Sequence, residues 1–172
     1  NPAALRANLA DLRPGGTIIA DAADFTPRNL AKVGYQDNPL TDGTLEDYDL
    51  HAIDLTGLAV AAVSDFGLGR KDAARTKNMF ALGLLTWLYS RPVEGTLEYL
   101  KEKFASDPNL RDANIAAFKA GNAYGETKES FAHRYEVGKA QLPEGTYRQI
   151  SGNRALAYGL MAGAVKSGLP LY

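Results

Sequence analysis

The chain has 172 residues, of which 45% are hydrophobic, and a formal net charge of −1. This size and hydrophobic content suffice for one domain and a fragment of a second, whereas the near-neutral charge argues against general nucleic-acid binding, which needs clustered positive charge. Because there is no cysteine, the chain can hold no disulfide, no cysteine-ligated iron–sulfur cluster and no thiolate zinc site. The absence of cysteine fits a cytoplasmic protein. The sequence also shows no signal peptide and no membrane-spanning run.

The N-terminal segment is expected to form a helix and then a strand. Asn1 can cap the helix and Pro2 suits its first position. Apolar residues follow at helical spacing until residues 14–16, Pro-Gly-Gly, end the helix. Thr17–Ala20 is a short apolar run, typical of a strand covered on both faces in an α/β sheet.

Asp21 and Asp24 follow this predicted strand. Ligands bind at the carboxyl ends of strands in open α/β sheets, so both carboxylates are candidates for a ligand site. Aspartate is also a common turn and cap residue, and we favour that structural interpretation.

The next segments alternate between loop, strand and helix. Thr26–Thr44 is rich in Pro, Gly, Asn and Asp and predicts a long surface loop with a short helix near Arg28–Lys32. Tyr48–Ile53 is predicted to be a second strand. Thr56–Val63 is predicted to be a short apolar helix.

Lys71–Tyr89 is predicted to be one helix of roughly 20 residues. Apolar residues surround its second half, Met79–Tyr89, so we expect that half to be buried on every side. Gly83 interrupts it at a cost of about 1 kcal/mol relative to alanine, which predicts that another backbone approaches closely there. Pro92 is expected to end the helix.

Basic residues crowd the start of this helix at Arg70, Lys71, Arg75 and Lys77. Cations are unfavourable at a helix N-terminus, where backbone N–H groups favour an anion instead. A solvated basic face is the simpler interpretation. The alternative is a site for a phosphate or for the acidic surface of a partner.

Two amphipathic helices are predicted next, over Glu94–Ala105 and Leu110–Gly121, with Gly121 and Gly125 as stop signals. Residues 128–148 carry charge without steady periodicity and predict a linker. A helix over Ala155–Val165 and the beginning of a strand at Leu169–Tyr172 would then open a second domain.

The residues by themselves supply no catalytic constellation. His51 and His133 are the only histidines and lie far apart, so no metal site is predicted. Gly67 and Gly69 begin a G-x-G, but Asp72 stands where the dinucleotide-binding fingerprint has its third glycine, so no dinucleotide site is assigned. No nucleophile elbow and no P-loop occur.

Four strings in order carry a resemblance: NPAALRANLADLRPGGTIIAD, ARTKNMFALGLL, ANIAAFKAGNAYG and SGNRALAYGLMAGAVKSGLPLY. Together they resemble the α subunit of 2-oxoacid:ferredoxin oxidoreductases of the 2-oxoglutarate type, over nearly the whole chain. The resemblance implies an α/β fold. It would consist of a fragment of a three-layer α/β/α γ domain over residues 1–126, a connector over 127–149, and the first helix and strand of a thiamine-diphosphate-binding domain over 150–172.

The resemblance also implies a reaction, CoA-dependent oxidative decarboxylation of a 2-oxoacid with electrons passed to ferredoxin. The complex would use thiamine diphosphate, Mg²⁺ and a [4Fe–4S] cluster held by a partner subunit, and its partners would be the β subunit and ferredoxin, with no nucleic acid or membrane. We expect this chain to be an inactive piece of the larger subunit, with no catalytic and no metal-binding residue. Arg75, Lys77 and Asn78 are the candidate CoA or interface residues.

A second hypothesis from another class stays open. The chain could be a stand-alone, non-catalytic α/β module that binds a partner or a nucleotide. The sequence flanking this chain would discriminate between the two hypotheses.

Overall fold

The computed structural model describes residues 1–127, 131 and 134–170. The chain divides into two compact units, Asn1–Val137 and Gly138–Tyr172. Among the described residues, the first unit holds all helices and strands except the last helix, α8 (Gly152–Ser167).

The first unit is built around two parallel strands, β1 (Thr17–Asp21) and β2 (Asp49–Ile53), with Thr17 opposite Asp49 and Asp21 opposite Ile53. Neighbouring residues of a strand face opposite sides. Accordingly, Ile19 packs with a core cluster from helices α3 (Leu55–Ala62) and α5 (Lys77–Leu88), whereas Ala20 packs with a cluster that includes Phe25 and Leu30. Both faces of the short sheet are therefore covered, as parallel strands require.

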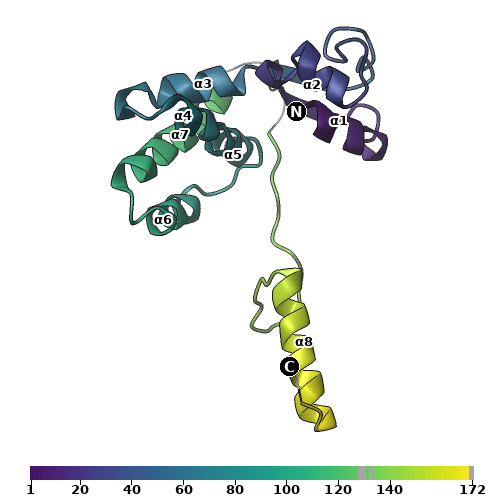
Figure 1. The fold of residues 1–172 in the computed structure, drawn as a ribbon, viewed down its shortest axis with the longest axis vertical. Coiled ribbons are helices and arrows are strands. Elements are labelled where there is room, and N and C mark those ends of the chain that lie inside the picture. The colour runs from purple at the N-terminus through teal and green to yellow at the C-terminus, as the bar shows by residue number, and fades with distance from the viewer. Residues whose placement is uncertain (128–130, 132–133, 171–172) are drawn as a thin grey trace. The chain divides into compact units, whose positions relative to one another are not determined.

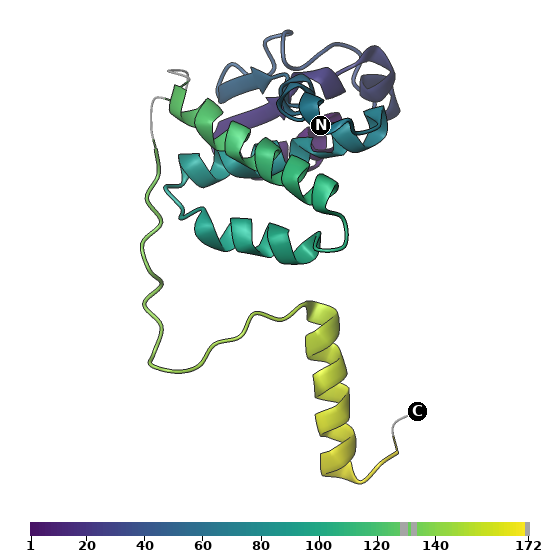
Figure 2. The same ribbon diagram turned by 90° about the vertical axis from the view of Figure 1, so that its left-hand side faces the viewer.

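The helices of this unit follow in chain order (Figures 1 and 2), and most agree with the sequence pattern. They are α1 (Pro2–Asn8), α2 (Pro27–Lys32), α3 (Leu55–Ala62), α4 (Arg70–Arg75), α5 (Lys77–Leu88), α6 (Glu94–Lys103) and α7 (Pro108–Thr127). Short 3-10 turns at Leu9–Asp11, Ala22–Asp24 and Ser64–Phe66 connect them. The predicted cap is confirmed, because the Asn1 side chain accepts a hydrogen bond from the Ala4 N–H at 3.0 Å.

Helices α5 and α7 cross with their backbones in contact, side by side in Figure 1. A Cβ atom built at Gly83 would overlap the carbonyl oxygen of Phe118, and one built at Gly121 would overlap that of Phe80. The close approach predicted at Gly83 is confirmed. It lets Phe80 and Phe118 become almost completely buried, at 2% and 1% exposure.

The prediction of one long helix over Lys71–Tyr89 is wrong, because Thr76 separates α4 from α5. Both the hydroxyl and the N–H of Thr76 donate to the Ala73 carbonyl, at 2.7 and 3.1 Å. A threonine hydroxyl that bonds back to its own helix competes with the backbone ladder and bends the helix.

Burial of α5 on every side is also wrong. Leu82, Leu85 and Tyr89 are 39–41% exposed, so one face of the helix is open. Helix α5 ends at Leu88, so Pro92 is not the residue that ends it. Ser90, just after the helix, has a left-handed φ of 49°.

The expected stop of α7 at Gly121 and Gly125 is wrong as well, since the helix runs on to Thr127. These glycines are contact positions instead. Gly121 lies against the Phe80 backbone, and Gly125 lies against the Trp87 ring.

Arg134 and Tyr135, which follow α7 in the chain, contact the end of α5. The Tyr135 N–H donates to the Leu88 carbonyl at 2.7 Å, and the Arg134 guanidinium lies 5.0 Å from the centre of the Trp87 ring. Residues 134–150, which cover most of the predicted linker, form no helix or strand.

The second unit contains α8 (Gly152–Ser167), capped by the Ser151 hydroxyl and ended by Gly168 at φ 68°. None of its described residues is buried within the unit. A strand was expected to begin at Leu169–Tyr172. Leu169 and Pro170 are not in a strand, and residues 171–172 lie outside the described part of the chain.

Replacing Gly121 by alanine should destabilise the protein by about 1–3 kcal/mol, because the added methyl group forces the two helix backbones apart. Chemical denaturation measures this. Gly95→Ala is the control, since a Cβ atom there meets nothing within 4 Å. Equal stability of the two variants would contradict the backbone contact.

Phe80→Ala should cost about 3–5 kcal/mol in chemical denaturation, as large-to-small changes at a buried aromatic do. Leu82→Ala is the matched control on the same helix, because Leu82 is 39% exposed whereas Phe80 is 2% exposed. A loss for Phe80→Ala no larger than that of the control would mean that α5 presents a different face to the core.

Candidate functional site

An ionic cluster lies at the carboxyl end of β1, where the sequence placed Asp21 and Asp24. The Lys77 ammonium, at the first position of α5, donates to Asp21 Oδ2 at 3.0 Å and to Asp24 Oδ2 at 2.9 Å. Thr56 at the start of α3 donates its hydroxyl to Asp21 Oδ2 at 2.6 Å. The cluster therefore ties the end of a strand to the beginnings of two helices, which agrees with the structural interpretation of the aspartates.

The pKa values of Asp21 and Lys77 are shifted in the direction that favours their charged forms. Burial acts to raise the pKa of Asp21, but the hydrogen bonds from Thr56 and Lys77 outweigh it and hold the pKa below its ordinary value of 3.8. For Lys77, burial acts to lower the pKa, and the carboxylates of Asp24 and Asp21 raise it above its ordinary 10.5. The anion that compensates Lys77 is thus supplied by the protein itself.

The structure separates the three predicted site residues. Lys77 faces the aspartates, whereas Arg75 and Asn78 line a cavity of about 270 Å³ between the α4–α5 junction, the end of α6 and the beginning of α7. The Arg75 guanidinium donates to Asp72 at 3.0 Å, and both side chains of this pair are more than half exposed. Arg75 and Asn78 therefore belong to one candidate site, at the cavity, whereas Lys77 belongs to the ionic cluster.

Asn114 lines the same cavity, and sequence reasoning missed it. It is 7% exposed, and its amide N–H donates to the Leu110 carbonyl at 2.8 Å. A signal existed in the sequence, because an asparagine between Ala113 and Ala117 on the apolar stripe of a helix is a polar group in a buried position.

His51 belongs to a structural network. Its Nε2 lies 3.0 Å from Asp49 Oδ2, and its ring stacks on Phe131 at 4.3 Å. Thr17 donates to the same Asp49 oxygen at 3.3 Å, which links the two strands. His133, the other histidine, lies outside the described residues.

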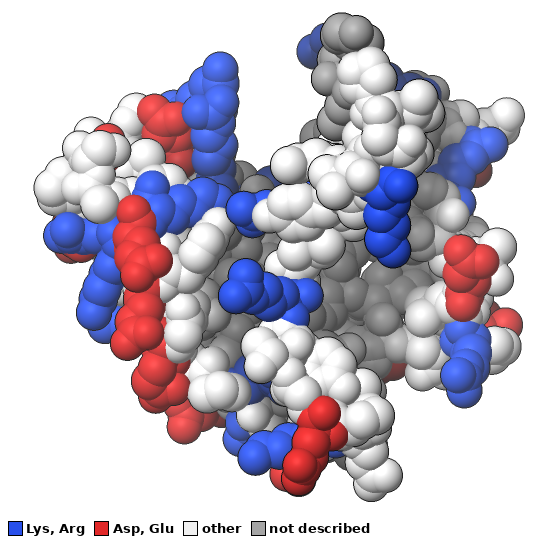
Figure 3. Space-filling view, turned by 90° about the horizontal axis from the view of Figure 1, so that it is seen from below, with Lys and Arg blue, Asp and Glu red and all other residues white. Residues whose placement is uncertain are grey.

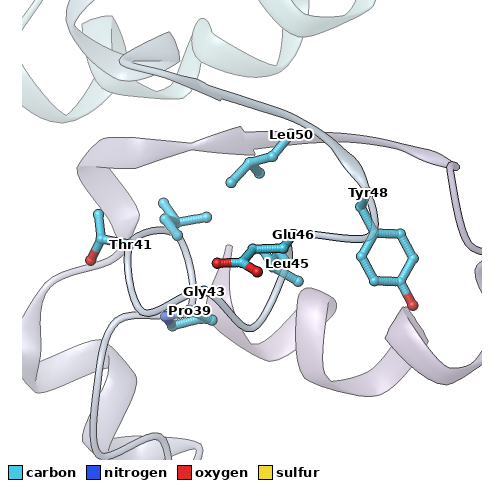
Figure 4. A pocket seen from close by; sticks show the side chains of 8 residues that line it. Pro39, Thr41, Gly43, Leu45, Glu46, Tyr48 and Leu50 are labelled. Carbon is cyan, nitrogen blue, oxygen red and sulfur yellow. The ribbon is translucent and has the colours of Figure 1, made fainter.

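A second cavity, of about 410 Å³, lies in the long loop before β2 (Figure 4) and is lined by Pro39, Leu40, Thr41, Gly43, Leu45, Glu46, Tyr48 and Leu50. Glu46 is the one charged residue of this lining. Leu45 is only 3% exposed, so much of this lining is the core of the loop itself.

Mixed surface charge, and the lack of a metal-ligand cluster or a membrane-spanning helix among the described residues, add no site of those kinds. Acidic and basic side chains lie beside one another on the face shown in Figure 3. Among the described residues, no three histidine, aspartate or glutamate side chains come together as possible metal ligands. Within the same residues, no helix combines the length and hydrophobicity that crossing a membrane requires.

Comparisons with known proteins agree on one family. The family model described as pyruvate ferredoxin/flavodoxin oxidoreductase matches residues 1–124. The chain is 52% identical over 171 residues to a Mycobacterium tuberculosis protein named 2-oxoglutarate oxidoreductase subunit KorA. That alignment covers 99% of this chain but 26% of the relative, so the chain spans about a quarter of the relative's length. No solved structure gives a significant match.

The ionic cluster predicts an acid-dependent loss of stability. Because the pKa of Asp21 is lowered on folding, its contribution is complete above the unfolded value of about 3.8 and is lost as the pH falls through the folded value. The difference in unfolding free energy between wild type and Asp21→Asn should be constant from about pH 7 to 5 and shrink toward about pH 2. Asp37→Asn leaves the cluster intact and is the control. A difference that does not change with pH would contradict the ionised pair.

Proposed function

We propose the function from one premise: the chain belongs to the pyruvate ferredoxin/flavodoxin oxidoreductase family. Within it, we infer that the chain is part of the α subunit of a 2-oxoglutarate:ferredoxin oxidoreductase. The observation that carries this inference is the 52% identity over 99% of the chain to a subunit named for 2-oxoglutarate. The reaction would be CoA-dependent oxidative decarboxylation, with electrons passed to ferredoxin.

The proposed domain plan assigns residues 1–126 to a three-layer γ domain, 127–149 to a connector and 150–172 to the beginning of the pyrimidine-binding domain. Helix clusters on both faces of β1 support the three-layer part. The division of the chain at residues 137–138 supports a separate C-terminal part. Residues up to Val137 pack with the first unit, so the connector would be anchored at its beginning.

Two groups of the family, the iron–sulfur cluster and Mg²⁺, find no set of ligands among the described residues of this chain. The [4Fe–4S] cluster needs cysteine thiolates, and the chain has none. The described residues offer no cluster of carboxylates for Mg²⁺. In the complex we propose, thiamine diphosphate, Mg²⁺ and the iron–sulfur cluster are bound outside this chain, the cluster by the β subunit. We also propose that the enzyme is cytoplasmic.

For this chain we propose an accessory role at a CoA or subunit contact. Arg75 and Asn78 would make that contact, because both line one cavity and the side chain of Asn78 makes no hydrogen bond to another described residue. The sequence analysis grouped Lys77 with these two residues. Its ion pairs with Asp21 and Asp24 instead support a structural role, in which Lys77 holds the beginning of α5 in place.

The function is tested on the complete protein that carries this chain, produced with its β subunit. Reduction of a viologen dye should require both 2-oxoglutarate and CoA, and pyruvate should be a much poorer substrate. The 172-residue chain by itself should give no turnover. Activity of the chain alone, or no activity of the complex with any 2-oxoacid, would favour the stand-alone binding module instead.

In the same complex, Arg75→Ala should raise the Michaelis constant for CoA severalfold and leave that for 2-oxoglutarate nearly unchanged. The reason is loss of a guanidinium that can bind a phosphate in two-pronged geometry. Arg70→Ala is the control, an exposed arginine of the same helix that does not line the cavity. Wild-type constants and wild-type subunit assembly for Arg75→Ala would show that this charge has no part in the site.

A further inference from the structure

The short sheet has one edge with no strand beside it. Within the described residues, β1 pairs with β2 and with no other strand. The Asp49 N–H donates to the Gly16 carbonyl at 3.1 Å, and in a parallel pair this directs the N–H and C=O of Ile18 toward β2. Because backbone groups alternate in direction along a strand, the N–H and C=O of Thr17 and Ile19 point to the other edge. Unpaired groups of this kind are a template for a further strand.

A cavity of about 660 Å³ lies beside this edge. Thr17 and Ile19 of β1 line it, no residue of β2 does, and the opposite wall includes Leu85 and Tyr89 at the end of α5. These two side chains are 41% and 40% exposed, so a strand paired with β1 would cover them. A sheet gains independent stability only with three or more strands or with helix packing, and here the helix to pack against is already in place.

The helices on the other face of the sheet indicate where such a strand belongs in the sequence. Helix α2 connects β1 to β2, and its Leu30 is clustered with Ala20 of β1. Leu5 of α1 packs against the same cluster, so α1 lies on that face as well. Crossovers between parallel strands are nearly always right-handed, and two crossovers of one hand on one face move the strand order in one direction. A strand joined to β1 through α1 would therefore lie next to β1, on the side away from β2.

We propose that in the complete protein β1 pairs with a third parallel strand, which directly precedes α1 in the sequence. The inference rests on the proposed function only in that this chain is part of a larger subunit, of whose matched relative it spans 26%. Loops between a strand and the next helix usually have about 2–6 residues, so the third strand ends that close to α1. Because both of its faces are covered, it is an almost continuous apolar run of about five residues.

The test is amide hydrogen exchange at single-residue resolution on the complete protein without its β subunit. The Ile19 amide should exchange as slowly as those of Ile18 and Ala20, to within tenfold, because both sets are hydrogen-bonded to a neighbouring strand. Exchange at Ile19 more than tenfold faster would overturn the proposal. Protection that appears only when the β subunit is bound would also overturn it, since the strand would then belong to the partner.

Two variants assign the third strand to its segment. Removal of the residues before Asn1 should speed exchange at Ile19 at least tenfold, while slow exchange at Ile18 shows that the sheet is still folded. Leu85→Lys, which places a charge under the third strand, should also release Ile19 and replaces the truncation if the truncated protein does not fold. Val60→Lys is the control, because Val60 on α3 is 38% exposed and does not line the cavity.

Wild-type exchange at Ile19 in the folded truncated protein, or in Leu85→Lys, overturns the proposal. So does a complete sequence without an apolar run before Asn1. An active complex in which Ile19 exchanges freely contradicts this inference alone. Slow exchange at Ile19 in a complete protein without oxidoreductase activity contradicts the proposed function alone.

Discussion

The crossing of α5 and α7 at Gly83 and Gly121 is the contact on which the first unit depends. Because neither position carries a Cβ, each helix reaches the other's carbonyl oxygens. This separation lets Phe80 and Phe118 fill the space on either side, and a wider crossing would leave voids that the core cannot tolerate without loss of stability. Burial of Leu84 and packing of Ile19 from β1 against the same cluster follow from it.

The ionic cluster fixes the end of the sheet relative to this helix pair. A carboxylate as buried as Asp21 would be costly without partners, and Thr56 and Lys77 provide them. The consequence for function is a division of the basic residues. Because Lys77 is engaged in internal contacts, an external anion would have to bind another basic residue near the α4–α5 junction. Arg75 is such a residue, and it lines a cavity.

Local signals predicted the fold well where one residue decides one structure. The Asn1 cap, the short helix near Arg28–Lys32 and the two short strands are of this kind. The errors arose where one residue type serves two purposes. Gly121 is equally a stop signal and a contact position, and only the partner backbone of α5 decides between them. The break at Thr76 is similar, because the sequence does not reveal which acceptor its hydroxyl chooses.

The candidate site was predictable in part for a physical reason. Cations at a helix start imply an anion, and that argument holds for each cation separately. For Lys77 the anions are Asp21 and Asp24, which come from a strand end more than fifty residues earlier, as the 56- and 53-residue separations show. Local spacing carries no information about such a partner. For Arg75 the partner is the neighbouring, exposed Asp72. The expectation that an external anion binds there therefore still holds for Arg75. Asn114 enters the same cavity only because the glycine crossing brings α7 against the beginning of α5.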